Sequence, residues 1–281
     1  MRMDMSPSQV FAMEPRDGVQ SNNHSLESQH PFLIAASVIT LFLTLGGIGA
    51  RTYTKAAVMK QFAFPDWVLL LTGALFIAYV SFNIHLWNIP SPSTGEALMS
   101  FNIMEILYCP AMFCAKYVVL RQIELIFFNH DRKALAFTAI RILIWANLLF
   151  YTAALISFIL SCIPRAKIWD PALPGVCIDT QYSVVITGAI NVLSDLTILV
   201  TPIAAIWQLQ LPLKRKIGSS AVFGVGVLAN ITSIVRLYYS IQLGYSNDIA
   251  WSVVWISSWA LGEFTTGILV ACLPCFPRLY W

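Results

Sequence analysis

Charge is scarce in this sequence: only 11% of its 281 residues are Asp, Glu, Lys or Arg, against about 25% in ordinary soluble domains. Hydrophobic residues make up 58% of the chain, and the mean hydropathy is +0.71. A water-soluble fold of this length could not cover its surface with so few charged side chains. The composition therefore excludes soluble enzymes, disordered scaffolds and nucleic-acid-binding modules, and we expect no nucleic-acid partner.

The common catalytic and cofactor motifs are also missing. The sequence has no glycine-rich phosphate loop, no H-E-x-x-H, no G-x-S-x-G and no aspartate-rich diphosphate motif. The last hydrophobic stretch, Ile249–Leu273, holds no lysine, which a retinal Schiff base of the microbial rhodopsin type requires. Cys and His residues do not follow metal-ligand spacing. We therefore expect no metal and no organic cofactor.

Long hydrophobic stretches dominate what is present. A helix of about 20 apolar residues crosses the hydrocarbon core of a bilayer. Seven stretches reach that length: Pro31–Ala50, Trp67–Asn88, Phe101–Leu120, Thr138–Ile163, Ser183–Trp207, Ser220–Leu243 and Ile249–Leu273. They are too long for strands and lack a two-residue alternation. The predicted fold is all-α, a seven-transmembrane helix bundle over residues 31–273, in the lipid bilayer of the plasma membrane or the endoplasmic reticulum.

Basic residues in the predicted loops indicate the orientation of the bundle. Ten of them fall on one side, at Arg51, Lys55, Lys60, Arg121, Arg132, Lys133, Lys214, Arg215, Lys216 and Arg278, and four on the other. Because Lys and Arg concentrate in cytoplasmic loops, we predict an amino terminus outside and a cytoplasmic carboxy terminus. Residues 1–30 are expected to form a disordered extracytoplasmic tail with a glycosylation sequon at Asn23, and residues 274–281 a short cytoplasmic tail.

Two of the six cysteines flank the predicted outer loop between the fourth and fifth spans. A bridge between Cys162 and Cys177 would close a loop of about 15 residues and add about 3 kcal/mol in the chain-entropy model. The compartment outside the cytoplasm is oxidising enough to keep such a bridge. We predict this disulfide; the alternative is two free thiols at helix ends.

Five charged residues lie deep inside the predicted spans: Glu105, Lys116, Asp195, Arg236 and Glu263. At about 1.5 Å per helical residue, Glu105 and Arg236 reach the same outer level and can pair. Asp195 and Glu263 lie near the middle of the membrane, and the long stem of Lys116 can reach either of them. Three carboxylates against two bases leave one carboxylate without a basic partner.

Two polar neighbours extend this set. Asn191 lies four residues before Asp195 and therefore shares its helix face, and His85 closes the second span where it could line a cavity mouth. Two interpretations stay open. The groups form an ion-pair network that sets helix register without any ligand, or they line a polar cavity in which one mid-membrane carboxylate works as acid, base or ligand anchor.

A larger pattern runs over residues 31–278. It consists of Arg51-Thr52-Tyr53, Asp66-Trp67, His85, Lys116, Cys162-Ile163-Pro164, Trp169, Cys177, Asn191, Asp195, Pro202, Ile206-Trp207-Gln208-Leu209, Lys214, Arg236, Glu263 and Ala271-Cys272-Leu273-Pro274. As a set, these positions resemble the fungal rhodopsin-like integral membrane proteins, of the satratoxin-cluster membrane protein type. The resemblance implies a membrane protein often encoded beside fungal secondary-metabolite genes, with no broadly assigned chemistry.

Our first hypothesis is an accessory or catalytic component of a fungal secondary-metabolite pathway that acts on a lipophilic intermediate. Asp195 or Glu263 would donate or accept a proton in a dry cavity. Lys116 and Arg236 would hold the carboxylates ionised or bind an anionic group. Whether the protein is an enzyme stays open at this point.

The alternative hypothesis is an orphan seven-helix receptor-like protein that senses a small ligand. Its basic cluster at Lys214, Arg215 and Lys216 would contact a cytoplasmic partner, although basic inner loops are expected in any membrane protein. Receptor-like relatives often carry a cysteine-rich outer domain or a long inner tail. This sequence has neither, which favours the pathway hypothesis.

Overall fold

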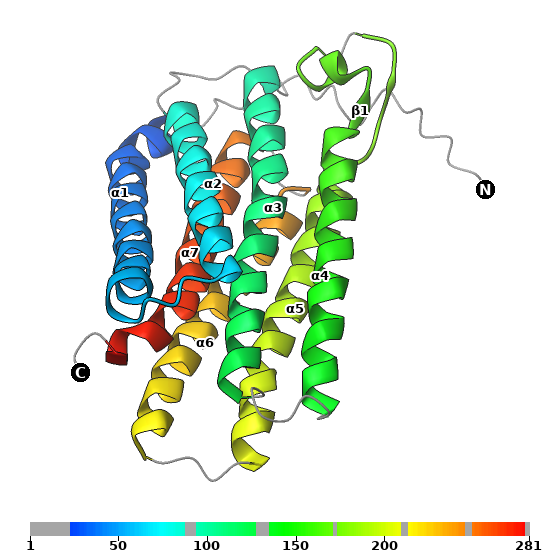
Figure 1. Cartoon of the computed structure of the whole chain (residues 1–281). Coiled ribbons are helices and arrows are strands. Elements are labelled where there is room, and N and C mark those ends of the chain that lie inside the picture. Colours follow the sequence, from blue (N-terminus) through cyan, green and yellow to red (C-terminus); the bar gives the residue numbers. More distant parts are fainter. Residues whose placement is uncertain are drawn as a thin grey trace.

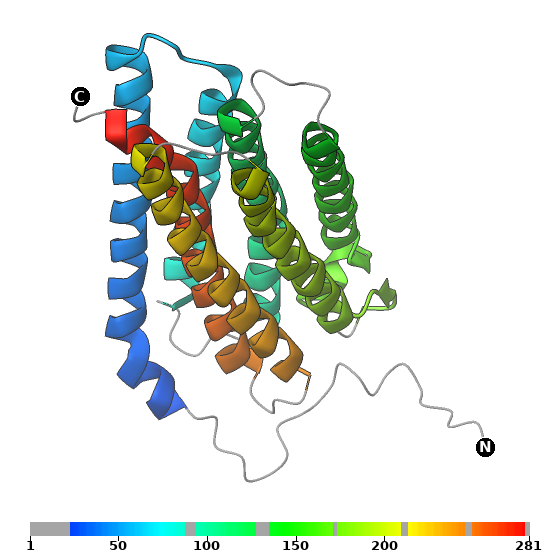
Figure 2. The ribbon, with the colours of Figure 1, turned by 90° about the horizontal axis from the view of Figure 1, so that it is seen from below.

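A computed structural model of the chain describes residues 23–87, 94–127, 135–170, 173–208, 213–244 and 249–278. Seven helices that are long and apolar enough to cross a membrane stand side by side (Figure 1, Figure 2), and the predicted seven-span, all-α architecture is confirmed. These helices are α1 (Asn23–Tyr53), α2 (Phe64–Trp87), α3 (Thr94–Phe127), α4 (Leu135–Ile159), α5 (Thr180–Gln208), α6 (Leu213–Gln242) and α7 (Ile249–Cys272).

The short elements lie between the helices or after them. They are the π-helical turn η1 (Thr54–Val58), the strands β1 (Cys162–Ile163) and β2 (Val176–Cys177), and the 3₁₀ turns η2 (Arg165–Ile168) and η3 (Leu273–Arg278). We call the end of the bundle that carries β1 and β2 the hairpin end. The opposite end, where η1 leads into α2, is the Asp66 end.

Central and edge positions differ strongly in burial. α3 and α7 are the most buried spans, because α7 packs against α6, α1 and α3, and α3 packs against α2 and α4. Figure 1 and Figure 2 show α1 and α4 at opposite edges of the bundle. The interior of the bundle is therefore built mainly around α3 and α7.

Several boundaries differ from the predicted ones. α3, expected over Phe101–Leu120, runs from Thr94 to Phe127, so Arg121 lies in a helix and not in a loop. α1 begins at Asn23, so residues 23–30 are helical although they fall in the segment expected to be disordered. α4 ends at Ile159, before the predicted end of its span, because Cys162 and Ile163 pair with β2. α6 begins at Leu213, so residues 214–216 lie in its first turn and not in a loop.

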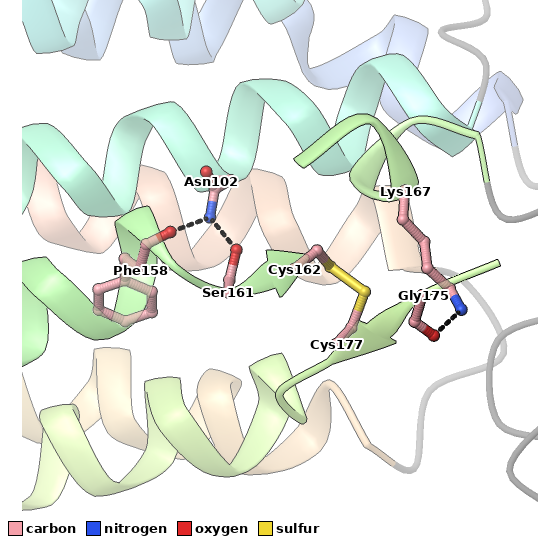
Figure 3. The surroundings of a disulfide bond; sticks show 7 residues. All are labelled: Asn102, Phe158, Ser161, Cys162, Lys167, Gly175 and Cys177. Atoms are coloured by element: carbon pink, nitrogen blue, oxygen red, sulfur yellow. Dashed lines mark hydrogen bonds between the residues drawn. A yellow bond between two sulfur atoms is a disulfide. The ribbon is translucent and has the colours of Figure 1, made fainter. Parts of the chain in front are cut away.

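The hairpin end is closed by the predicted disulfide, which is confirmed (Figure 3). β1 pairs antiparallel with β2, Cys162 lies opposite Cys177, and their sulfur atoms are bonded. Gly175 precedes β2, and a Cβ atom there would lie 2.5 Å from the carbonyl oxygen of Ile163. The absence of a side chain at Gly175 therefore allows the two strands to approach.

A buried amide connects this hairpin to the bundle. Asn102 of α3 donates from Nδ2 to the carbonyl of Phe158 at 3.1 Å and to Oγ of Ser161 at 3.2 Å (Figure 3). On the other side of the hairpin, Asp179 accepts the backbone N–H of Gln181 at 3.0 Å and so caps the start of α5. The end of α4 and the start of α5 are thus both held in place.

The core beside the interior polar groups is aromatic. The ring of Phe264 in α7 meets Phe76, Tyr79 and Tyr108 with centroid distances of 5.8, 5.2 and 5.3 Å, each in an edge arrangement. Such edge contacts are favourable for aromatic pairs. They pack α2, α3 and α7 together next to Glu263, the residue that precedes Phe264.

Candidate functional site

Nine polar side chains from five helices form one connected group inside the bundle, which we call the interior network. Its members are Glu105, Tyr108 and Lys116 of α3, Tyr151 of α4, Asn191 and Asp195 of α5, Ser233 and Arg236 of α6, and Glu263 of α7. From Glu105 to Lys116 the network extends about 16 Å along the helix axis. It brings together all five charged residues that were predicted at depth.

Glu263 is the most connected carboxylate. Tyr108 donates to its Oε2 at 3.0 Å, Ser233 Oγ lies 2.7 Å from its Oε1, and Asn191 donates to Oε1. Arg236 Nη1 lies 3.4 Å from Oε2. The Glu263 side chain is only 1% exposed, so these four groups replace water as its surroundings.

Asp195 forms the second centre. Lys116 Nζ lies 2.9 Å from its Oδ1, and Ser233 Oγ lies 2.7 Å from its Oδ2. Lys116 also donates to the backbone carbonyl of Asn191 at 3.2 Å. Lys116, which was predicted to reach either Asp195 or Glu263, thus pairs with Asp195. The Asp195 side chain is 12% exposed, which makes it the most accessible of the three carboxylates.

Arg236 lies between two carboxylates. Its Nη2 is 3.5 Å from Glu105 Oε1, its Nη1 contacts Glu263, and its guanidinium lies 3.9 Å from the ring centroid of Tyr108. The predicted pairing of Arg236 with Glu105 is therefore found. The expectation that one carboxylate lacks a basic partner was wrong, because one guanidinium serves two carboxylates. The count of three carboxylates to two cations is unchanged.

Some polar atoms of the network have no partner among the described residues. Arg236 Nε and Glu105 Oε2 are buried without a hydrogen bond. Nearly all buried polar atoms in proteins are paired with protein or with ordered water. This part of the network therefore has the capacity to bind one more oxygen or hydroxyl group.

Three members of the network were not predicted from the sequence. Tyr108 lies three residues after Glu105, and Ser233 three residues before Arg236, so helical spacing from known charges could have found both. Tyr151 lies on α4 and donates to Asn191 Oδ1 at 2.5 Å. Only the packing of α4 against α3 and α5 reveals it.

Other predicted residues lie outside the network. His85 is exposed near the hairpin end of α2 and does not belong to it. Asn23 is the first residue of α1, and its side chain lies outside the described part of the structure, as do those of Lys214, Arg215 and Lys216. Within the described ranges, no group of three His, Cys, Asp or Glu side chains could hold a metal ion.

A second group of buried charges lies at the other end of the bundle, and we call it the Asp66 cluster. Arg51 donates from Nε and Nη2 to Asp66 Oδ1 at 3.1 and 2.9 Å, and Lys55 donates to Oδ2 at 3.0 Å. Arg51 Nη1 also contacts Gln122 Oε1 and the carbonyl of Ala271. The assignment of Arg51 to a loop was wrong: it is a buried residue of α1 that joins four helices.

Comparison with known proteins gives consistent matches. A family model described as a fungal rhodopsin domain matches residues 50–280, which include the whole interior network. The "SAT4 family membrane protein" of Emericella nidulans is 38% identical over 179 residues, covering 64% of this chain and 45% of that protein. This chain therefore spans less than half the length of that relative.

Two further relatives carry names of biosynthesis clusters. "Fugralins biosynthesis cluster protein 2" of Gibberella zeae is 25% identical over 285 residues, covering 95% of this chain and 70% of that protein. "Wortmanamides biosynthesis cluster protein C" of Talaromyces wortmannii is 23% identical over 256 residues, covering 85% of this chain and 68% of that protein.

Proposed function

This chain belongs to the fungal rhodopsin domain family, and from this premise we propose that it is a component of a fungal secondary-metabolite pathway. It acts there on a lipophilic intermediate that reaches the protein through the membrane. The interior network moves a proton on that intermediate, with Asp195 and Glu263 as the acid–base pair. The relatives named for biosynthesis clusters support the pathway, and the geometry of the network supports the chemistry.

The observation that carries this proposal is the position of Ser233. Its Oγ lies 2.7 Å from Asp195 Oδ2 and also 2.7 Å from Glu263 Oε1. A hydroxyl has a single hydrogen to donate, so it can satisfy only one of these two short contacts. The second contact requires a hydrogen from the carboxyl group itself. We infer that Asp195 and Glu263 share one proton through Ser233.

The charge balance of the network leads to the same inference. Among the described residues, the three carboxylates form ion pairs only with Lys116 and Arg236, and isolated charge is expensive inside a membrane. One bound proton brings the network to neutrality. We infer that this proton is the one available for transfer.

The proposed step is an internal proton shift on the substrate. The carboxyl group gives its proton to one atom of the intermediate, and a carboxylate of the pair removes a proton from another atom, as in an isomerisation or a cyclisation. Atoms and electrons balance without an oxidant or a reductant. Asp195 meets the substrate because it is the more accessible partner, and Glu263 stores the proton.

Arg236 provides the anchoring group in this mechanism. Its unpartnered Nε can donate to a substrate oxygen, and an arginine hydrogen bond to an anionic oxygen is stronger than a neutral one. Lys116 keeps Asp195 in position through its 2.9 Å contact. The network thus contains a proton donor, a proton acceptor and an oxygen-binding group within one dry interior.

The test is expression of the full chain in a host that is supplied with candidate intermediates. We expect Asp195→Asn and Glu263→Gln to abolish conversion while the amount of folded protein in the membrane stays near that of the wild type. Glu96→Gln is the matched control, because it makes the same chemical change at an exposed position of α3 outside the network. It should keep full conversion.

Full conversion by both Asp195→Asn and Glu263→Gln contradicts the proton-transfer proposal. The receptor interpretation would replace it if a small ligand drives association with a cytoplasmic partner. In that case neutralising Lys214, Arg215 and Lys216 together abolishes the association, which a pull-down from membranes measures.

We further propose that the hairpin end faces away from the cytoplasm. The Cys162–Cys177 disulfide supports this, because such bridges persist in oxidising compartments. Basic residues of the predicted loops concentrate toward the other end, as the positive-inside rule requires. Glycosidase digestion of the membrane-inserted chain tests the orientation: a loss of mass that depends on Asn23 places the amino terminus outside.

A further inference from the structure

Two adjoining hollows lie along α4, away from the interior network, the first between α3 and α4 and the second on α4 alone. The first has a volume of about 380 Å³ and is lined by Tyr117, Arg121, Arg141, Ile144 and Trp145. The second, of about 590 Å³, is lined by Phe137, Thr138, Arg141, Ile142, Trp145, Ala146 and Leu149. Arg141 and Trp145 line both, so the two hollows form one continuous groove, which we call the α3–α4 groove.

The groove has a polar head near the Asp66 end. Arg121 lies four residues before the end of its span at Leu125, and Arg141 lies four residues after the start of its span at Phe137. The Cα atoms of both residues are thus about 6 Å inside the span limits. This depth corresponds to the region where the hydrocarbon core meets the lipid head groups.

Among the described residues, the head of the groove carries more positive than negative charge. Arg121 Nη1 contacts Glu124 Oε2 at 2.5 Å, but its Nε is buried without a partner. Arg141 is exposed, its guanidinium lies 5.3 Å from the ring centroid of Phe137, and it forms no ion pair with the described residues. Two cations therefore face a single described carboxylate, and an anion of one negative charge would balance the site.

The rest of the groove is apolar and points into the membrane. Ile142, Trp145 and Leu149 of α4 are 62, 63 and 69% exposed. α4 runs from the Asp66 end to the hairpin end, so Leu149 lies about 12 Å deeper than Arg141. Figure 2 shows that α4 stands at the edge of the bundle, where its outer face is open to the surroundings.

We propose that the α3–α4 groove binds one anionic phospholipid molecule. Its phosphate lies between Arg121 and Arg141, and one acyl chain follows Ile142, Trp145 and Leu149 toward the middle of the membrane. The charge, depth and direction of the groove match a molecule with an anionic head and an apolar tail. Basic pockets between transmembrane helices are known to bind such head groups, and the planar fork of arginine fits phosphate oxygens well.

A soluble anion or a second copy of this chain fits the groove less well. A free phosphate or other small anion would occupy only the polar hollow and leave the apolar hollow unexplained. A second copy would bring its own Arg121 and Arg141 or an apolar helix face to this site, and neither neutralises the unpaired guanidinium. A phospholipid fits both hollows, with its head group in the polar hollow and an acyl chain in the apolar hollow.

Native mass spectrometry of the purified full chain tests the proposal, with phosphatidylserine and phosphatidylcholine of identical acyl chains as probes. We expect the wild type to retain phosphatidylserine about tenfold more tightly, which corresponds to about 1.4 kcal/mol. Arg121→Gln combined with Arg141→Gln should remove this preference. Lys60→Gln is the matched control, because Lys60 is an exposed basic residue at the same end of the bundle but outside the groove.

A second measurement uses the wild-type protein and needs no arginine variant. In phosphatidylcholine vesicles that contain brominated phosphatidylserine, the tryptophan fluorescence should be quenched more strongly than with brominated phosphatidylcholine. Trp145→Phe should remove most of the difference, because Trp145 lines both hollows. Equal quenching by the two lipids contradicts the proposal.

Three further outcomes would also overturn it. Equal loss of the preference in Lys60→Gln and in the double arginine variant indicates general surface electrostatics. Displacement of the lipid by excess inorganic phosphate indicates a site for a soluble anion. A dimer that separates in the double arginine variant, without any retained lipid, indicates an interface between two copies.

Discussion

The two buried charge clusters of this protein have opposite ratios of cations to carboxylates. In the Asp66 cluster, two cations surround one carboxylate, and both oxygens of Asp66 are occupied: Oδ1 by Arg51, and Oδ2 by Lys55 and by the backbone N–H of Ala63 at 3.0 Å. In the interior network, three carboxylates share two cations, the hydroxyls of Tyr108 and Ser233 and the amide of Asn191.

Under the proposed function, this difference distinguishes the Asp66 cluster, which holds helices together, from the interior network, which transfers a proton. Both oxygens of Asp66 already accept hydrogen bonds, and two cations lie beside them, so nothing in the Asp66 cluster favours a bound proton. The cluster joins α1 to α2, and through Arg51 also to α3 and α7. A surplus of carboxylates in a dry interior favours binding of a proton and leaves polar atoms unpartnered. We therefore expect changes in the Asp66 cluster to affect stability alone, and conservative changes in the interior network to affect activity most.

The largest expected effect follows from the loss of Arg236. Arg236→Met keeps the length of the side chain but leaves Glu105 and Glu263 facing each other without a cation. Removal of one partner from a buried ion pair costs about 3–5 kcal/mol. Unfolding of the detergent-solubilised protein by a stronger denaturing detergent should show a loss of this size.

The double variant Glu105→Gln with Arg236→Met is the control for this effect. Glu105→Gln removes the charge of one of the two carboxylates that Arg236→Met leaves without a cation. This should restore part of the lost free energy of unfolding. If Arg236→Met unfolds no more easily than the wild type, Arg236 does not hold the network together.

The second prediction concerns the Asp66 cluster. Asp66→Asn removes the negative charge that balances Arg51 and Lys55, while Arg51 keeps Gln122 and the carbonyl of Ala271 as acceptors. Hydrogen bonds to charged groups contribute about 1.5–3 kcal/mol, and we expect a loss of about 2 kcal/mol in the same unfolding experiment. Conversion per folded molecule should stay at the wild-type level. A specific loss of conversion without a loss of stability would mean that the two clusters do not differ as described.

The smallest expected effect is that of a single hydroxyl group. Tyr151→Phe removes the 2.5 Å hydrogen bond to Asn191, and interhelical hydrogen bonds in membrane proteins contribute about 0.6 kcal/mol on average. Tyr79→Phe is the matched control, because the Tyr79 hydroxyl makes only a 3.5 Å contact with the carbonyl of Ser257. Tyr151→Phe should lower the free energy of unfolding more than Tyr79→Phe. An equal effect of the two variants would show that Tyr151 contributes nothing beyond its ring.

The charged members of the network could be found in the sequence because a charge stands out within an apolar span. Lys116 and Asp195 were recognised in this way, but depth alone left open whether Lys116 pairs with Asp195 or with Glu263. Tyr151 carries no such signal, since tyrosine is common in membrane helices and its partner Asn191 lies on another helix. Ser233 could have been found only through its helical spacing from Arg236.

Arg51 illustrates the opposite error. It follows an apolar run and therefore looks like the start of a loop, but α1 continues through it to Tyr53. The helix extends because Asp66 at the start of α2 binds the guanidinium, and that contact exists only when the two helices are packed together. The polarity of Arg51 thus predicted a loop, whereas the structure places Arg51 inside α1, paired with Asp66.

The amino-acid sequence by itself determined the class of this protein, its seven spans and the positions of the five charges of the interior network, because transfer into a membrane depends on the polarity of each segment alone. Only the tertiary structure decided that Arg236 serves two carboxylates, that Ser233 bridges Asp195 and Glu263, and that Arg121 and Arg141 share a groove. These facts depend on the rotation and lateral packing of helices. In a membrane, packing is set by van der Waals contacts and hydrogen bonds between helices, and hydropathy along the chain carries little information about them.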